Sequence, residues 1–240
     1  MKIPIVKEYG SWAVFIFSCS AGITAGLLAR PWQTGKDFSL ATLLTVLGLI
    51  FLINSKNPLS SVLRTGGREK EHLLWFMFFS LAGIALLIPF LTEGAKPFLV
   101  FSPLVFGYVI LLSGRQEHNI FTELTGFALL TLSAPVIYFV ITGELSLRLY
   151  LAVFIFFAAG VFKVKARIKK TLAYRWLMIL YCAASFIVFF YYLNISAIVL
   201  LPLFENFVYV LWMRDEKLVT TGNIELLKGV VFTVLLGFFW

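Results

Sequence analysis

Long apolar runs that repeat along the whole chain limit what this protein can fold into. Nine such runs are separated by short polar segments, at about 11–29, 38–54, 73–91, 98–113, 121–140, 147–162, 176–193, 195–212 and 223–240. A helix needs about 20 residues to cross the hydrocarbon layer of a membrane, with a range of about 17 to 25. We therefore predict an all-α, polytopic membrane protein with about nine transmembrane helices, in one domain that covers residues 1–240. The run at 147–162 is the weakest span, because it needs Leu145 or Lys163 to reach full length.

The composition also indicates lipid as the solvent of this chain. Apolar residues make up 60% of the sequence and charged residues only 13%, against about 25% charged residues in an average soluble domain. The mean hydropathy is +0.94. These values exclude a soluble domain, a disordered chain, a disulfide scaffold and a nucleic-acid-binding protein. Cys19 and Cys182 fall inside apolar runs, so we expect both to be small buried hydrophobic residues.

The net charge is +8, and the basic residues fall mainly on one side of the membrane when the nine runs are taken as spans that cross it in alternating directions. Four of the 20 Lys and Arg residues fall on one side, namely Arg30, Lys36, Lys96 and Arg148, and the other 16 fall on the opposite side. Lys and Arg accumulate in the loops that stay in the cytoplasm. The pattern predicts a cytoplasmic amino terminus and places Trp240 at the outer face. The longest polar segments, 55–72 and 163–175, are then both cytoplasmic.

The segment Lys7–Ala13 carries a resemblance to a known family. It reads Lys-Glu-Tyr-Gly-Ser-Trp-Ala, which resembles the Arg-Glu-His-Gly-Ala-Trp-Ala signature of the YwiC-like bacterial membrane proteins. The similarity continues at Asn57-Pro58-Leu59, Thr122–Phe127, Ala134-Pro135 and Gly222–Leu226. The resemblance implies a multi-pass protein of the bacterial cell (inner) membrane, and it does not name a reaction.

A second resemblance is more distant and concerns the layout of the helices. Nine helices with large cytoplasmic loops after the second and the sixth are similar to UbiA-type intramembrane prenyltransferases, which hold magnesium through aspartate-rich motifs in these loops. Asn54 falls where the first motif has its asparagine, and Arg64–Arg68 resembles the Arg-Thr-x-x-Arg that follows. However, 54–68 contains no aspartate and 163–175 contains no acid. The resemblance thus implies a UbiA-like scaffold without the magnesium–diphosphate site, and we expect no metal and no cofactor.

Glu205 and Lys228 are candidate functional residues because charges inside a span are expensive. A charge at the centre of a helix costs about 2.5–3.5 kcal/mol on insertion scales. Glu205 follows Pro202 near the middle of its run, and Lys228 enters the ninth run from the same side. With 1.5 Å of rise per residue, their depths are comparable, so we predict that they pair across two helices. Such a pair is either a structural ion pair or a proton or ligand site.

A second group of candidates gathers on the cytoplasmic side. Lys7 and Glu8 precede the first run and form either a polar lid over an inner-face cavity, with Tyr9 and Trp12 as walls, or an interfacial anchor. Glu123 lies one turn into the fifth run, where it either lines a cavity or caps its helix and pairs with Arg115. The basic segment from Lys163 to Arg175 is interpreted as a snorkelling segment, with binding of anionic lipid as the alternative.

These residues support three hypotheses about function. In the first, the protein binds an isoprenoid or another amphipathic lipid in a cytoplasm-facing cavity, whose expected lining is Lys7, Glu8, Tyr9, Trp12, Asn54, Arg64, Arg68, Arg115 and Glu123. The second is a small transporter that uses Glu205 and Lys228. The third is a prenyltransferase with an altered site. Membrane lipids are the expected partners, nucleic acid is not, and no catalytic residue is assigned.

No motif for another chemistry is present in the sequence. We find no phosphate-binding Walker loop, no nucleophile elbow, no His-Glu-x-x-His and no Cys-x-x-Cys. His72 and His118 have no metal-binding spacing. In the first run, Gly22 and Gly26 have the small-x-x-x-small spacing that favours close contact between helices.

Overall fold

The computed structural model describes residues 4, 6, 8–29, 39–66, 68–114, 119–193, 195–212 and 218–240. In these ranges the protein is built from helices: α1 (Tyr9–Leu28), α2 (Leu40–Asn54), α3 (Lys56–Thr65), α4 (Lys70–Leu86), α5 (Ile88–Phe98), α6 (Ser102–Ser113), α7 (Ile120–Thr131), α8 (Ser133–Thr142), α9 (Leu147–Lys169), α10 (Leu172–Val188), α11 (Phe204–Trp212) and α12 (Leu218–Phe239). Two short 3₁₀ segments, η1 (Leu99–Phe101) and η3 (Ala197–Leu203), and one π-helical segment, η2 (Phe189–Leu193), adjoin some of these helices. The protein is therefore all-α in the part that the structure describes.

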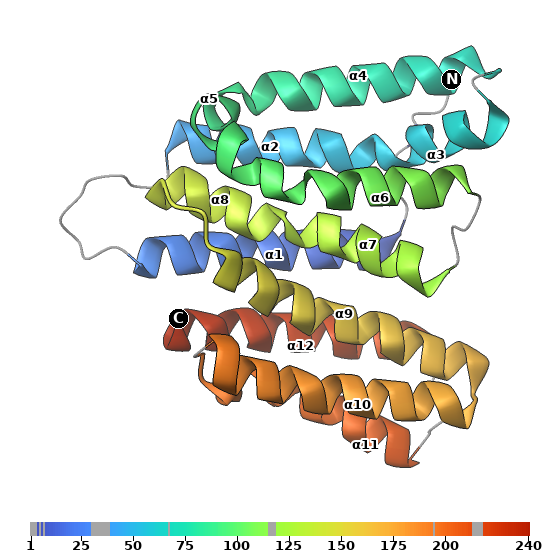
Figure 1. The fold of residues 1–240 in the computed structure, drawn as a ribbon, viewed down its shortest axis with the longest axis vertical. Coiled ribbons are helices and arrows are strands. Elements are labelled where there is room, and N and C mark those ends of the chain that lie inside the picture. The colour runs from blue at the N-terminus through green and yellow to red at the C-terminus, as the bar shows by residue number, and fades with distance from the viewer. Residues whose placement is uncertain are drawn as a thin grey trace.

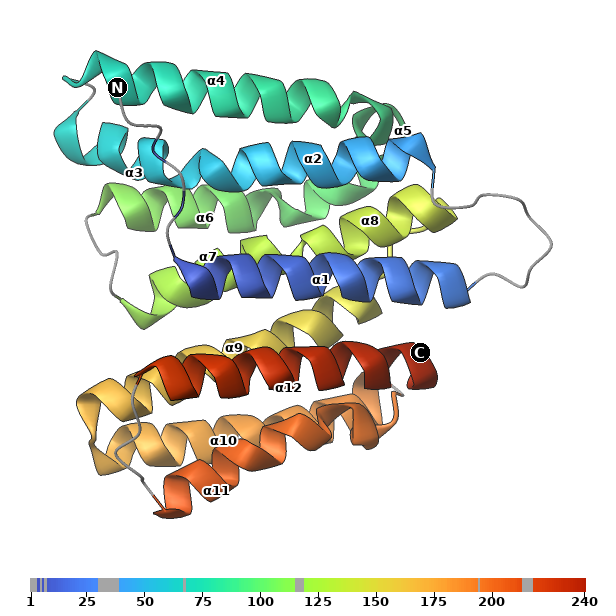
Figure 2. The ribbon, with the colours of Figure 1, turned by 180° about the vertical axis from the view of Figure 1, so that it is seen from behind.

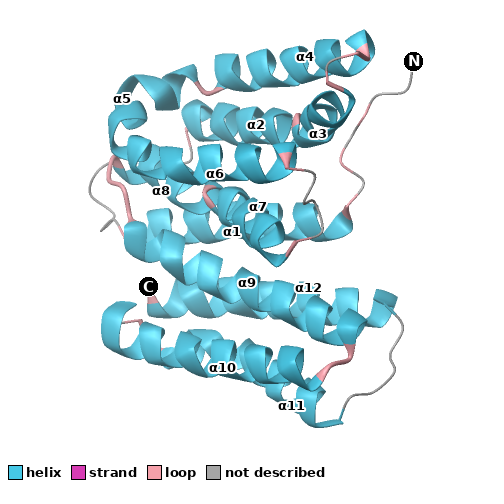
Figure 3. Cartoon of the chain, turned by 45° about the vertical axis from the view of Figure 1, so that its right-hand side comes forward, coloured by secondary structure: helices cyan, strands magenta, loops and turns pink. Residues whose placement is uncertain are grey.

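The long helices lie side by side and run across the long axis of the molecule (Figure 1). From one edge to the other, the order is α4, α2, α6, the α7–α8 pair, α1, α9, α12, α10 and α11 (Figures 1 and 2). Helix α1 begins at the end of the bundle that also holds α3 and the last turn of α9, whereas α12 finishes at the opposite end (Figure 3). The long helices therefore run between two opposite ends of the bundle, which is the arrangement expected of helices that cross a membrane.

Seven helical stretches are long and apolar enough to cross a membrane. They are Tyr9–Leu28, Leu40–Thr65, Gly94–Ser113, Ile120–Thr142, Leu147–Lys169, Leu172–Leu193 and Thr220–Phe239. The other two expected spans correspond to the 17-residue helix α4 and to the shorter apolar stretch Ala197–Trp212. The protein is thus a multi-pass membrane protein.

Prolines explain where the helices differ from uninterrupted spans. A proline has no backbone N–H and clashes with the carbonyl four residues before it. The run expected at 73–91 divides at Leu87, just before Pro89, and α5 then continues through the polar segment expected after residue 91. The fifth run divides into α7 and α8 at Leu132, close to Pro135. Pro202 lies inside η3, so the eighth run begins as a tight 3₁₀ segment and becomes α-helical only at Phe204.

Small residues and aromatic rings hold the helices together. A Cβ atom at Gly22 of α1 would overlap the Ala134 carbonyl oxygen of α8, and one at Gly26 would press on Ile141. The close contact expected of these two glycines is therefore present between α1 and α8. Further along, the rings of Phe156 on α9 and Phe232 on α12 stack with their centroids 3.9 Å apart. Helix α1 also packs directly on α12, where a Cβ atom at Gly229 would overlap the Phe17 ring. Helices α1 and α9 therefore both contact α12.

Candidate functional site

A cavity of about 760 Å³ is lined in part by residues at the start of α1. Residues from α1, α2, α3, α5, α6, α7, α8 and α9 contribute to its wall. Its apolar wall includes Phe15, Leu52, Phe90, Val109, Leu130 and Val136. Its polar wall consists of Glu8, Ser11, Ser55, Lys56, Asn57, Ser60, Tyr108, Thr122, Glu123 and Ser133. Most of the polar residues come from α1, α3 and α7 near their starts, whereas Ser133 begins α8 and Tyr108 lies in α6. The cavity is therefore more polar near the starts of α1, α3 and α7 than in the rest of its wall.

Glu8 forms one side of the polar end. It precedes the first turn of α1, and the Ser11 hydroxyl donates a hydrogen bond to its Oε2 over 2.8 Å. The same oxygen accepts from the Lys56 ammonium of α3, also at 2.8 Å. This ion pair ties the start of α1 to the start of α3, and both partners line the cavity.

Glu123 forms the other side, on the first turn of α7. Its Oε1 lies 2.6 Å from the Lys165 ammonium of α9. The expected partner, Arg115, lies outside the described residues. Next to Glu123, the Thr122 side chain is buried and lines the cavity, and its hydroxyl has no hydrogen-bond partner in the described part of the chain.

Asn54 and Trp12 support this end of the molecule without lining the cavity. The Val6 amide donates to Oδ1 of Asn54 over 3.2 Å, and the Trp12 indole donates to the Val6 carbonyl over 2.9 Å. Asn54 also donates through Nδ2 to the Ile50 carbonyl within its own helix. Both side chains therefore fix the segment before α1 against α2.

The remaining residues of the expected lining lie elsewhere. Tyr9 is exposed on the first turn of α1, and Arg64 and Arg68 are exposed near the end of α3 and after it. None of these three is among the described residues that line the cavity. Lys7 is outside the described residues, as is Arg115. The structure thus brings together Glu8 and Glu123 from the expected set.

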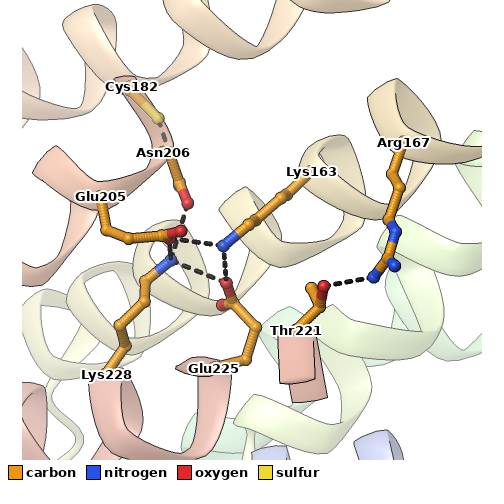
Figure 4. A network of polar contacts seen from close by, with 8 residues as sticks. All are labelled: Lys163, Arg167, Cys182, Glu205, Asn206, Thr221, Glu225 and Lys228. Atoms are coloured by element: carbon orange, nitrogen blue, oxygen red, sulfur yellow. Dashed lines mark hydrogen bonds and ion pairs between the residues drawn. The ribbon is translucent and has the colours of Figure 1, made fainter. Parts of the chain in front are cut away.

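A second polar group lies between α9, α11 and α12 (Figure 4). The predicted contact between Glu205 and Lys228 is present, with 3.2 Å between Oε2 and Nζ. Lys163 approaches the same Glu205 oxygen at 2.5 Å and Glu225 Oε1 at 2.8 Å, and Lys228 also contacts Glu225 Oε1 at 2.8 Å. We call these four residues the charge cluster. Its two ammonium groups neutralise its two carboxylates.

Lys163 corrects one expectation from the sequence. It was expected in a polar cytoplasmic segment, but α9 continues without interruption to Lys169, and the Lys163 side chain is only 1% exposed. Lys165 and Arg167 are likewise part of α9, where Arg167 donates to the Thr221 hydroxyl of α12. Alternate basic side chains of α9 therefore contact opposite neighbours, α12 on one side and α7 on the other.

Neutral polar groups complete the surroundings of the charge cluster. The Asn206 carbonyl oxygen accepts from Lys228 over 2.7 Å, and its amide contacts the Cys182 sulfur at 3.6 Å. The Lys163 ammonium lies 5.1 Å from the centre of the Tyr209 ring, a distance typical of a cation–π contact. Cys182 and Cys19 are both buried, and neither forms a disulfide. Lys163 thus contacts two carboxylates and an aromatic ring, and Lys228 contacts two carboxylates and an amide oxygen.

Three members of this group, Lys163, Glu225 and Asn206, were not predicted from the sequence to contact Glu205 and Lys228. Glu225 lies three residues before Lys228, one turn away on the same face of α12, and that spacing was available in the sequence. Asn206 follows Glu205 directly. Lys163 carried no comparable signal, because a lysine at the end of an apolar run is commonly interfacial.

The arrangement does not suit a magnesium site of the prenyltransferase kind. Such a site needs several carboxylate oxygens around one small cation. Among the described residues, no three His, Cys, Asp or Glu side chains lie close enough together to hold a metal ion. The carboxylates that line the cavity, Glu8 and Glu123, are each bound to a lysine.

Comparison with known proteins gives one match. A family model described as YwiC-like protein matches residues 5–138 of the 240. The matched range runs from the segment before α1 into α8 and includes most of the cavity wall, whereas the charge cluster lies beyond it. No curated protein and no solved structure matches the chain. The resemblance to UbiA-type scaffolds therefore stays a prediction.

Proposed function

The chain belongs to the YwiC-like family, and from this premise and the cavity we propose that it binds an amphipathic lipid. The apolar tail would lie in the cavity, against residues such as Phe15 and Val136, and the polar head would lie between Glu8 and Glu123. The protein would act as a binding or carrier protein of the bacterial cell membrane.

The change from a polar to an apolar wall is the observation that carries this proposal. Sites for small molecules have volumes of about 300–1,000 Å³ and mostly apolar walls with a few polar groups. The cavity, at about 760 Å³, has such a wall, and most of its polar groups lie near the starts of α1, α3 and α7. A lipid with an isoprenoid or acyl chain and a small polar head would place its chain against the apolar wall and its head against the polar groups.

The distribution of charge supports a cytoplasmic position for the polar end of the cavity. Figure 1 shows α3, the start of α4, the end of α9, the start of α10 and the start of α12 at that end of the bundle, and α5 and the start of α9 at the other. By their places in or next to these helices, the first group of described Lys and Arg residues is Lys56, Arg64, Arg68, Lys70, Lys163, Lys165, Arg167, Lys169, Lys170, Arg175 and Lys228, and the second is Lys96 and Arg148. Because cytoplasmic loops are enriched in Lys and Arg, we infer nine crossings with the amino terminus inside. We also retain the UbiA-like arrangement as a proposal about the scaffold.

Enzymatic use of such a cavity is a separate hypothesis. A prenyltransferase with an altered site would need to neutralise a diphosphate without the aspartates that hold magnesium. An assay of metal-dependent turnover with prenyl diphosphates tests this reading, and loss of turnover in Arg64→Ala and Arg68→Ala would support it. Since both arginines lie away from the cavity wall, we favour binding without turnover.

The charge cluster favours a second candidate function, a proton-coupled transporter. Glu205 and Glu225 are partly exposed whereas their two lysine partners are buried, and a transporter of this kind would take up and release a proton at one of these carboxylates. Protonation of either glutamate would release two ammonium contacts between α9, α11 and α12. In that case, Glu205→Gln would abolish transport without changing the amount of lipid bound in the cavity.

Native mass spectrometry of the protein in mild detergent tests the binding proposal. We expect wild-type protein to retain an amphiphile in a stoichiometric amount. Val109→Trp, which fills the cavity, should remove it, whereas Val234→Trp on the exposed face of α12 should leave it bound. Wild-type protein without bound lipid, or equal occupancy in both variants, would contradict the proposal.

A further inference from the structure

The basic segment from residue 163 to residue 175 divides into two parts in the structure. In the first part, Lys163, Lys165 and Arg167 each contact a neighbouring helix inside the bundle. In the second part, Lys169 ends α9 and Arg175 is the fourth residue of α10. Neither of these two side chains has a hydrogen bond or an ion pair within the part of the chain that the structure describes. The second part is therefore the one that can bind a partner outside the bundle.

The turn between α9 and α10 keeps this second part together. Only Lys170 and Thr171 separate the two helices, which pack side by side with the end of α9 and the start of α10 at the same end of the bundle (Figure 1). Lys170 has a left-handed backbone, with a φ of 50°. Glycine or asparagine usually takes that conformation after a helix. A lysine there adds a third basic residue to the turn, which we call the α9–α10 corner (residues 169–175).

No acidic residue balances the α9–α10 corner along the sequence. Residues 163–175 contain no acid, and α10 has none in its first turn. The exposed basic residues after α3 differ in this respect, because Arg68 and Lys70 alternate with Glu69 and Glu71. The α9–α10 corner is therefore complementary in charge to an anion, whereas the segment 68–71 has no net charge of its own.

An exposed apolar face of α10 begins at the same corner. Leu172, Trp176 and Leu180 follow one another at intervals of four residues, which places them on one face of the helix, and each is more than half exposed. Tryptophan is common where the hydrocarbon layer of a membrane meets water. A lipid whose head lies at the corner can therefore lay its acyl chains along this face.

From the charge of the corner and the apolar face beside it, we propose that the α9–α10 corner binds an anionic phospholipid of the surrounding leaflet. The phosphate accepts hydrogen bonds from Lys169 and Arg175, and the acyl chains lie along Leu172 and Trp176. In the orientation that we infer, this leaflet is the cytoplasmic one. None of these four residues is among those that line the cavity, so this second lipid site is independent of the proposed function.

Native mass spectrometry of the full-length protein, with phospholipid titrated into the detergent, tests the inference. The probes are phosphatidylglycerol, which is anionic, and phosphatidylcholine with the same acyl chains. We expect wild-type protein to bind phosphatidylglycerol more tightly. The double variant Lys169→Gln with Arg175→Gln should bind it about ten- to thirtyfold more weakly, since each basic residue near a membrane surface adds to the attraction of anionic lipid. Its affinity for phosphatidylcholine should not change.

A second double variant removes the same charge elsewhere at that end of the bundle. Arg68→Gln with Lys70→Gln should change the affinity for phosphatidylglycerol by less than about threefold, because exposed charges far from the corner are screened. Arg175→Lys keeps the charge and should retain most of the affinity. Lys169→Gln alone, at an exposed position, should weaken binding about fivefold and tests the corner without altering the half-buried Arg175.

Three results would overturn the inference. Equal losses in the two double variants would mean that only the net charge of the protein matters. Displacement of phosphatidylglycerol by an equal concentration of inorganic phosphate would make the corner an anion site without a lipid. Loss of phosphatidylglycerol binding in Val109→Trp would place that lipid in the cavity, because this variant fills the cavity and leaves the corner unchanged. Retained binding in Val109→Trp supports the corner whether or not the cavity binds an amphiphile.

Discussion

The ammonium of Lys163 on α9 lies 2.5 Å from the carboxylate of Glu205 on α11, 42 residues further along the chain. Lys163 is six residues from the end of α9, and Glu205 is seven residues from the end of α11, which places both about 9–11 Å inside the bundle. Glu225 lies at a similar depth, seven residues after the start of α12. Three helices therefore meet through charges at one level, inside segments that are otherwise apolar.

Replacement of Lys163 tests how much this contact stabilises the fold. Lys163→Met keeps the volume of the side chain and leaves two carboxylates with Lys228 as the remaining ammonium of the charge cluster. Removing one partner of a buried ion pair costs about 3–5 kcal/mol, so the free energy of unfolding should fall by that amount. Thermal unfolding in detergent is the measurement.

The matched control for this change is Lys169→Met, at the exposed end of the same helix. It should leave the unfolding temperature nearly unchanged. The double variant Lys163→Met with Glu225→Gln balances the charges again and should recover part of the loss, because the two sites interact. If Lys163→Met unfolds at the same temperature as Lys169→Met, the cluster does not stabilise the fold.

Gly22 provides a test of the contact between α1 and α8. Gly22→Ala places a methyl group on the Ala134 carbonyl oxygen, so the helices must separate, at a cost of about 1–3 kcal/mol. Gly107 on α6 has open space beside it, and Gly107→Ala should stabilise α6 by up to about 1 kcal/mol through helix propensity. Opposite shifts in unfolding temperature are expected, and equal shifts would exclude the close contact.

The inferred orientation in the membrane can be measured by cysteine labelling. Cys19 and Cys182 are buried, so the background reaction with a membrane-impermeant maleimide should be small. In intact cells we expect labelling of Glu144→Cys, between α8 and α9, but labelling of Lys169→Cys only after permeabilisation. The reverse pattern would contradict a cytoplasmic amino terminus.

Asn54 gives a test of how the segment before α1 is held. Asn54→Ala leaves the buried Val6 amide without its acceptor, which costs about 1–3 kcal/mol. Hydrogen exchange of that amide should therefore become about tenfold faster or more. Trp12→Phe removes the bond to the Val6 carbonyl but keeps the Val6 amide bonded, so its effect on exchange should be smaller. Unchanged exchange in Asn54→Ala would argue against this anchor.

Much of the fold could be predicted from the pattern of apolar residues. The number and spacing of the apolar runs predict an all-α, multi-pass protein, and the positions of most helices agree with the runs. The exact breaks could not be predicted from the prolines, because the helices end at different distances from Pro89, Pro135 and Pro202. Hydropathy also could not show that α9 extends to Lys169, because a lysine after an apolar run is found both in the loop that follows a helix and inside the helix itself.

The candidate site was less predictable than the fold. Glu205 and Lys228 were identified because each charge interrupts an apolar run, but Lys163 joins them only through the packing of α9 on α11 and α12. Similarly, the pairing of Glu123 with Lys165 depends on how α7 packs against α9. Thr122 carries no signal in the sequence, because only the packed structure shows that its hydroxyl lacks a partner.

The measurement that tests the central claim most directly is photolabelling in native membranes. An isoprenoid analogue with a diazirine near its polar end should label peptides that contain the starts of α3 and α7, near Lys56 and Thr122. Val109→Trp should abolish this labelling, and Val234→Trp should not. Labelling confined to lipid-facing segments such as the exposed face of α12, or labelling that Val109→Trp leaves unchanged, would contradict the account of the cavity as a lipid site.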